Sequence, residues 1–356
     1  MRERRHINIP LFIPHKGCPH TCVFCDQRKI SGTRLEQSLL KVKEILEDSL
    51  STVEAGDDVE IAFFGGSFTG LPEVQMVSYL ELARPYVEAG KVQGIRLSTR
   101  PDTINDHILD ILQQYGVTTI ELGVQSLDEE VLKLSRRGHT SDDTDKACTL
   151  IKERGIKLGI QTMLGLPGDS FPKALKTAQG VIRIKPSMVR IYPALVLEGT
   201  EMEALYRTGR YTPLSIEEAV NWCAAIVPLY RQAGITLLRI GLHASETLES
   251  SVVAGPYHPA FGELVESRIL YDKLVEQLDA MEPLKQERLI IRTRSELVSK
   301  LIGHKKSNIH AIKNKYALTE VRILSDLNEG EFMIIRVKDE NEGDSGYESN
   351  RYSHRY

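Results

Sequence analysis

Short β-rich runs alternate with amphipathic helical stretches through most of the chain, and this order restricts the fold more than any other feature. Between the runs, apolar residues recur at intervals of three and four, the spacing typical of a helix with one buried face. Alternating strands and helices indicate βαβ units around a parallel sheet, so we predict an α/β fold. The six predicted strands are 7–14, 59–66, 94–101, 119–126, 156–168 and 188–195, and a seventh run at 235–244 is a candidate extension of the sheet.

The size and composition are those of a globular protein. The chain has 356 residues, of which 41% are hydrophobic and 26% charged. A single core rarely grows beyond roughly 250 to 300 residues, so we expect one large domain with an appendage. No apolar run approaches the roughly 18 residues of a membrane span. Pro10 and Pro14 interrupt the apolar stretch after the basic amino terminus, which argues against a signal peptide and favours a cytoplasmic protein.

The pattern changes near residue 284, where a small α+β module is predicted. Its order is a strand (288–294), a helix (295–302), a tight connection (303–306), a second helix (307–316) and two strands (320–326 and 331–338). The segment that follows is polar and predicted to be disordered. The predicted limits are 1–250 for the main domain, 251–283 for an extension packing on it, 284–338 for the module and 339–356 for the tail.

Each predicted strand of the main domain ends in a loop rich in Gly, Ser, Thr, Pro or Arg, such as GGSFTG, STRPDT, VQSLDEE and GLPGDS. In parallel α/β folds these loops open on one face, where active sites are built. A loop with three cysteines, Cys18, Cys22 and Cys25, follows the first strand and therefore belongs to the same face.

The three clustered cysteines indicate metal or redox chemistry, because five cysteines in all do not suit a disulfide framework. A structural zinc site needs four protein ligands, and His15, His20 or Cys148 could supply the fourth. A [4Fe-4S] cluster held by three thiolates instead leaves one iron open to a small chelating molecule. Cys148 and Cys223 fall in helical patterns and are expected to be buried as small apolar residues.

The spacing Cys18-x3-Cys22-x2-Cys25, with Phe24 before the last cysteine, resembles the signature of the radical S-adenosylmethionine (radical SAM) superfamily. The resemblance implies a partial (β/α)6 parallel barrel, a [4Fe-4S] cluster and S-adenosylmethionine. It also implies that an electron from the reduced cluster cleaves the cofactor to a 5′-deoxyadenosyl radical, which abstracts hydrogen from a substrate.

Within that superfamily, the combined loop motifs are most similar to the radical domain of the elongator catalytic-subunit family, over roughly 7–275. They are less similar to oxygen-independent coproporphyrinogen oxidases. The stretch 254–274 also resembles the extension that follows the barrel in elongator-like bacterial proteins. The chain ends too soon to hold the acetyltransferase domain of that family, so its wobble-uridine carboxymethylation is not carried over.

The same resemblance implies a set of cofactor-binding residues. Gly65 and Gly66 would meet the methionine amino group, Gln125 the ribose hydroxyls and Arg137 the methionine carboxylate. Taken alone, the glycines also fit an ordinary turn and Arg137 a solvated surface residue. Met163 and Leu164 also fit the core. The full predicted set is Phe24, Gly65, Gly66, Ser67, Ser98, Arg100, Gln125, Arg137, Gln161, Met163 and Leu164.

No catalytic residue is identified, but four side chains near strand ends or in the extension are candidates. Isolated histidines and tyrosines more often have structural roles than catalytic ones. The candidates are Tyr192, His243, Tyr257 and His258.

The carboxy-terminal module resembles a KH RNA-binding domain, in which a Gly-x-x-Gly loop clamps a nucleotide backbone. The matching loop reads Gly303-His304-Lys305-Lys306, so a lysine replaces the second glycine. Residues 285–322 carry ten Lys or Arg against three Glu, on a chain whose net charge is −4. A basic module on an acidic chain favours a polyanionic partner, although a dimerisation or lid domain with a solvated basic face also fits.

We therefore predict a radical SAM enzyme, a transferase that modifies tRNA or rRNA and receives electrons from an external donor such as ferredoxin or flavodoxin. The RNA would be held through Gly303, His304, Lys305 and Lys306. Two alternatives remain open: a radical SAM enzyme acting on a protein or small metabolite, and a non-catalytic, zinc-stabilised RNA-binding protein.

Overall fold

The computed structural model describes residues 5–13, 17–19, 21–26, 30, 38–54, 56–281 and 287–337. The chain divides into two compact units, Met1–Pro259 and Ala260–Tyr356. His15, His20 and the predicted tail at 339–356 lie outside the described residues. Within the described residues, every helix is too short or too polar to cross a membrane.

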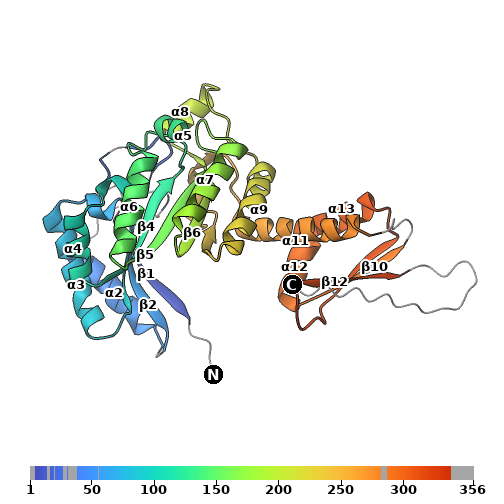
Figure 1. Ribbon diagram of the computed structural model, residues 1–356, viewed down its shortest axis with the longest axis horizontal. Helices are drawn as coiled ribbons and strands as arrows, with labels where there is room; N and C mark the ends of the chain where they lie inside the picture. Colours follow the sequence, from blue (N-terminus) through green and yellow to red (C-terminus); the bar gives the residue numbers. More distant parts are fainter. Residues whose placement is uncertain are drawn as a thin grey trace, which may run out of the picture. The chain divides into compact units, whose positions relative to one another are not determined.

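The first unit is built on a seven-stranded sheet with the order β1-β2-β3-β4-β5-β6-β8 (Figure 1). Every neighbouring pair is parallel, which confirms the predicted α/β class and the partial-barrel strand order. The seventh predicted run forms the edge strand β8. The strands are β1 (His6–Ile13), β2 (Asp58–Gly65), β3 (Gly94–Thr99), β4 (Val117–Gln125), β5 (Lys157–Leu164), β6 (Met188–Pro193) and β8 (Thr236–Ile240).

Helices connect successive strands, and local sequence fixes where several of them begin. The Thr140 hydroxyl accepts a hydrogen bond from the Asp143 amide, and the Asp143 carboxylate accepts one from the Thr140 amide. Such a reciprocal cap satisfies two amides that the first turn leaves unpaired. The helices are α2 (Leu39–Ser51), α3 (Glu73–Glu88), α4 (Asp106–Gln114), α5 (Glu129–Leu134), α6 (Ser141–Glu153), α7 (Phe171–Ile184), α8 (Glu201–Arg207), α9 (Ile216–Gln232) and α10 (Glu246–Ser251).

The two faces of the sheet have different environments. Phe63 of β2 stacks on Phe68, with ring centroids 4.8 Å apart, and also contacts Tyr79 of α3. Phe64 points to the opposite face, where the Arg190 guanidinium lies 5.7 Å from its ring centroid. Since β3, β4 and β5 separate β2 from β6, this contact requires a strongly curled sheet. The face that carries Phe64 and Arg190 is therefore the concave interior of the partial barrel.

The second unit contains helix α11 (Phe261–Asp279), strand β10 (Arg288–Thr293), helices α12 (Val298–Ile302) and α13 (Ser307–Lys315), and strands β11 (Glu320–Leu324) and β12 (Phe332–Val337). The sheet order is β11-β10-β12, with β11 parallel and β12 antiparallel to β10. The predicted element order is confirmed.

The division between the units differs from the predicted limit. Leu270, Leu274 and Leu278 of α11 form one apolar cluster with Leu289 and Ile291 of β10. The helix that the sequence assigned to a barrel extension is therefore part of the core of the second unit, which begins at Ala260 and not at residue 284.

Replacing Leu289 with Ala is expected to destabilise the second unit by about 3 kcal/mol, because the substitution leaves a cavity in this cluster. Leu289 is 0% exposed, whereas Ile335 on the other face of the sheet is 36% exposed and serves as the control. The free energy of unfolding of each variant is measured by urea titration of the full chain. Unfolding of the second unit is detected by the appearance of protease cleavage within it. Equal losses of unfolding free energy for Leu289→Ala and Ile335→Ala would contradict the assignment of Leu289 to the core.

Candidate functional site

The cysteine loop follows β1 and is held by backbone hydrogen bonds from two other segments. The Val23 amide donates to Ser135 O at 3.2 Å, and the Met202 amide donates to Val23 O at 2.8 Å. Cys22 is buried, Cys25 is partly buried and Cys18 is exposed, and all are free thiols. Among the described residues, no three His, Cys, Asp or Glu side chains are already gathered closely enough to hold a metal ion.

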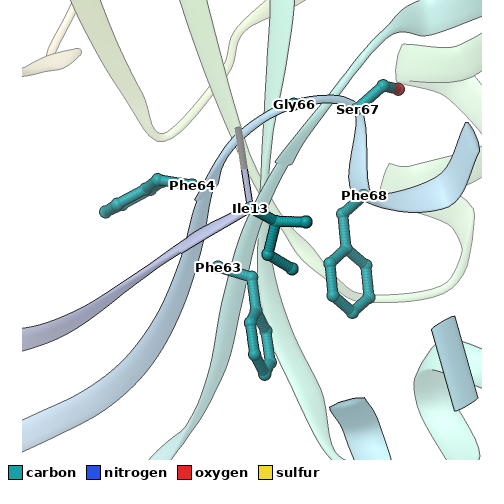
Figure 2. Close-up of a pocket in the computed structure, with 6 residues that line it drawn as sticks. All are labelled: Ile13, Phe63, Phe64, Gly66, Ser67 and Phe68. Carbon is teal, nitrogen blue, oxygen red and sulfur yellow. The ribbon is translucent and has the colours of Figure 1, made fainter. Parts of the chain in front are cut away.

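The glycine loop after β2 packs directly against the cysteine loop. The Gly66 amide donates to Ile13 O at 2.8 Å, and Gly65 has a φ of +109°, which only glycine adopts readily. A Cβ atom on Gly17 would overlap the Ser67 carbonyl. Figure 2 shows this turn, with Phe63 and Phe68 on one side of the strand and Phe64 on the other. The close backbone approach explains the need for small residues in both loops.

Hydroxyl groups join the glycine loop to the loop after β3. The Thr69 and Thr99 Oγ1 atoms are 2.6 Å apart, and Ser67 Oγ is 2.9 Å from Thr99 Oγ1. Thr103 extends the cluster, with its Oγ1 2.7 Å from that of Thr69. The sequence prediction included Ser67 but missed the three threonines, because a hydroxyl in a turn has no distinctive spacing.

Two buried arginines lie beside the cysteines. Arg137 is 6% exposed; its Nη1 donates to Cys22 Sγ at 3.1 Å and its Nη2 donates to Gly123 O. Arg100 is 3% exposed and donates to both carboxylate oxygens of Asp102, at 2.9 and 3.0 Å. The solvated-surface alternative for Arg137 is therefore excluded.

Partial desolvation raises the pKa of the Cys18 thiol. A hydrogen bond from the Ser67 backbone and the positive charges of Arg100 and Arg137 oppose that rise. The buried arginines therefore favour negative charge on the Cys18 sulfur.

Several buried polar atoms around these arginines have no hydrogen-bond partner: Arg100 Nη1, Arg137 Nε, Gln125 Oε1 and His139 Nδ1. Unpaired polar atoms are rare in protein interiors and call for a ligand or water. Gln125 also holds a φ of +66°, a conformation costing about 1 kcal/mol for a residue with a side chain. Thiols, guanidinium donors and an amide acceptor fit a metal cluster with a polar, carboxylate-bearing cofactor.

His139 was not selected from the sequence, although it follows Arg137 by two residues. Burial, together with the charges of Arg137 and Arg100, lowers its pKa from 6.5 to about 4. Its Nε2 lies 3.3 Å from Val124 O. The imidazole is therefore neutral at physiological pH.

A network of buried charges forms the floor of the concave interior. Glu121 of β4 is 1% exposed and accepts hydrogen bonds from Arg190 Nε at 2.6 Å, Arg96 Nη1 at 2.9 Å and Gln161 Nε2 at 3.0 Å. Arg96 also donates to Glu60 at 2.6 Å. Burial alone would raise the pKa of Glu121, but hydrogen bonds and charge from Arg190, Gln161 and Arg96 hold it below its ordinary value.

The structure places part of the predicted set together. Gln161 Nε2 also donates to Ser98 Oγ at 3.1 Å, so both residues belong to the floor. Phe24 packs in the apolar cluster that contains Cys22, and Met163 borders it. Leu164 is buried and has a core role.

The catalytic candidates are more scattered. Tyr192 follows Arg190 by two residues on β6 and shares its face, and the Arg190 charge opposes the rise in the Tyr192 pKa that burial causes. His243 is exposed, with its Nδ1 3.4 Å from Arg239 Nη1. Tyr257 packs against a separate cluster of Leu195, Leu197 and Leu248. Tyr192 is therefore the candidate that this geometry favours.

Comparison with known proteins decides the family. The family model described as "Radical SAM superfamily" matches residues 12–179, and "Radical_SAM C-terminal domain" matches 186–270. The chain belongs to the radical SAM superfamily. The radical SAM match spans the cysteine loop, the glycine loop and both buried arginines, and the cofactors of this family are a [4Fe-4S] cluster and S-adenosylmethionine.

The curated relatives include elongator proteins. A tRNA uridine(34) acetyltransferase of Methanocaldococcus infernus is 37% identical over 157 residues, covering 42% of this chain and 29% of that protein. Elongator complex protein 3 of Schizosaccharomyces pombe is 30% identical over 195 residues, covering 48% of this chain and 36% of that protein. The chain thus spans about a third of the length of these two relatives.

A solved structure supports the fold. The structure described as archaeal Methanocaldococcus infernus Elp3 with an amino-terminal deletion superposes with a TM-score of 0.61 at 24% identity. The superposition covers 79% of this chain and 65% of that one.

Replacing His139 with Gln is expected to weaken the dependence of folding stability on pH. A histidine whose pKa falls from 6.5 to about 4 on folding binds a proton more readily in the unfolded chain between these values. The stability that the neutral His139 side chain contributes to the folded state is fully present above pH 6.5. It is lost as the pH falls toward 4. Urea midpoints of wild type and His139→Gln across this interval measure the effect; parallel curves would contradict a buried neutral imidazole.

Proposed function

We propose that this radical SAM protein is an enzyme that modifies RNA and takes electrons from an external donor such as ferredoxin or flavodoxin. The observation that carries the radical chemistry of this proposal is the Arg137–Cys22 contact at 3.1 Å, surrounded by buried polar atoms that have no partner. A purely structural zinc site does not need two buried guanidinium groups and an unpaired amide beside its thiols.

The cofactor residues have distinct roles in this proposal. Cys18, Cys22 and Cys25 hold the cluster, which together with bound S-adenosylmethionine supplies a 5′-deoxyadenosyl radical for hydrogen abstraction. The glycine loop allows close approach of the cofactor to the backbone. Gln125 Oε1 is buried and unpaired, and in this proposal it would accept a hydrogen bond from a ribose hydroxyl.

The floor of the interior limits how deeply a substrate enters. Arg190 is fixed by two hydrogen bonds to Glu121, at 2.6 and 3.1 Å, and faces the ring of Phe64. Phe12 contacts the same ring, with centroids 6.5 Å apart. A planar group entering from the carboxyl ends of the strands would meet these rings and the Tyr192 side chain. In this proposal, contact with these side chains would orient the substrate.

An RNA substrate is supported by the relatives' printed names and by the second unit. Lys305 and Lys306 are exposed and have φ values of +51° and +63°. Each left-handed lysine costs about 1 kcal/mol. Asn308 Nδ2 donates to Ser267 Oγ at 3.0 Å and to Lys300 O at 3.1 Å, which ties the start of α13 to α11 and α12. The loop thus presents two ammonium groups next to a helix start that is tied to α11 and α12, and such charges attract phosphates.

The radical chemistry is tested with Cys22→Ala, using Cys148→Ala as a matched buried-thiol control. After anaerobic reconstitution, wild type and Cys148→Ala should bind about four irons per chain and form 5′-deoxyadenosine when reduced. Cys22→Ala should lose most of the iron and all of the product. One tightly bound zinc per wild-type chain, with no 5′-deoxyadenosine, would reject the proposal in favour of a zinc-stabilised protein.

The RNA role is tested with the double variant Lys305→Glu/Lys306→Glu. Binding to structured tRNA should weaken by about tenfold or more, and its salt dependence should become shallower, because two phosphate contacts are lost. Lys146→Glu/Lys176→Glu, which changes the same charge on exposed positions of the first unit, is the control. Equal binding by both double variants, with S-adenosylmethionine cleavage intact, would instead favour a protein or small-metabolite substrate.

A further inference from the structure

The guanidinium group of Arg137 donates a hydrogen bond to the cysteine loop. Nη1 donates to Cys22 Sγ at 3.1 Å and Nη2 donates to Gly123 O, so only Nε remains unpaired. An arginine that served only as a fork for a carboxylate would instead direct two free nitrogens into the site.

A second arginine fixes this arrangement. Arg100 Nη2 donates to the backbone carbonyl of Arg137, and Arg100 is itself held by two hydrogen bonds to Asp102. The neighbouring Arg136 has a φ of +52° and pairs on the surface with Glu201 at 2.6 Å. Consecutive arginines thus differ sharply: one side chain is in solvent and the next is buried against a thiol.

We propose that Arg137 donates a hydrogen bond to the cluster-bound Cys22 thiolate and makes the cluster easier to reduce, with Arg100 and Asp102 as positioning residues. This inference rests on the proposed function only in that Cys22 holds the cluster. Reduction adds one negative charge to the cluster, and a buried cation with an N–H group on sulfur stabilises that charge strongly where water is excluded.

The remaining donors complete the division of roles. Arg137 Nε and Arg100 Nη1 are both buried without partners, so they are the nitrogens left for the carboxylate of the cofactor. Arg137 would then contact both the cluster and the cofactor carboxylate, and Arg100 would contact that carboxylate, so that cofactor binding and cluster reduction affect each other.

The test is a reductive titration of the reconstituted full chain without S-adenosylmethionine or RNA, followed by electron paramagnetic resonance of the reduced cluster. Arg137→Met should lower the equilibrium constant for reduction about tenfold, which for one electron is 59 mV toward more negative potential. Arg136→Met is the matched control and should match wild type. Asp102→Glu, which keeps the negative charge but displaces it, should shift the potential in the same direction by less, because it loosens Arg100 without removing Arg137.

Each outcome has a defined meaning. An Arg137→Met potential equal to that of wild type, at equal iron content, overturns the inference and leaves Arg137 as a carboxylate ligand. If Arg137→Met does not retain iron, Arg137→Lys and Asp102→Glu decide: unchanged potentials in both overturn the inference, and a negative shift in either supports it. A wild-type chain that forms no cluster refutes the proposed function instead.

Discussion

The buried carboxylate of Glu121 is the centre of a network that joins β2 to β6, the strands that carry the site loops other than the cysteine loop after β1. It accepts hydrogen bonds from β3 through Arg96, from β5 through Gln161 and from β6 through Arg190, and Arg96 continues the network to Glu60 of β2. Removing one partner from such a buried pair typically costs about 3 to 5 kcal/mol, since the other charge is left uncompensated. The network therefore bridges β2 to β6 across the concave face of the curled sheet from which the carboxyl-end loops project.

The sequence predicted the parallel sheet, the cysteine loop and the glycine loop because each has a strict pattern. It did not predict Glu60, Arg96 and Glu121 in the floor, since alternating charged residues on a strand equally indicate a solvent-facing side. Tertiary contacts also decide that α11 joins the second unit and that Arg137 faces a thiol while Arg136 faces solvent. Periodicity does not contain that information.

Backbone strain is found at positions with proposed functional roles in both units. Gln125 at the end of β4 and the lysines of the α12–α13 connection all have positive φ values. Glycine would relieve the strain in each place, but it would remove an amide acceptor from the first site and two cations from the second. Arg136, Lys185 and Ala317 have similar φ values at the ends of helices, so it is the proposed use of the side chain that distinguishes Gln125 and the two lysines.

The central claim is that three thiolates leave one iron of the cluster open to S-adenosylmethionine. Electron–nuclear double resonance on the reduced protein, with the cofactor labelled by 17O in its carboxylate and 15N in its amino group, measures this directly. Hyperfine coupling to both labels is the predicted result. A reduced cluster that shows no coupling to either label, with the cofactor bound at saturating concentration, would contradict the account.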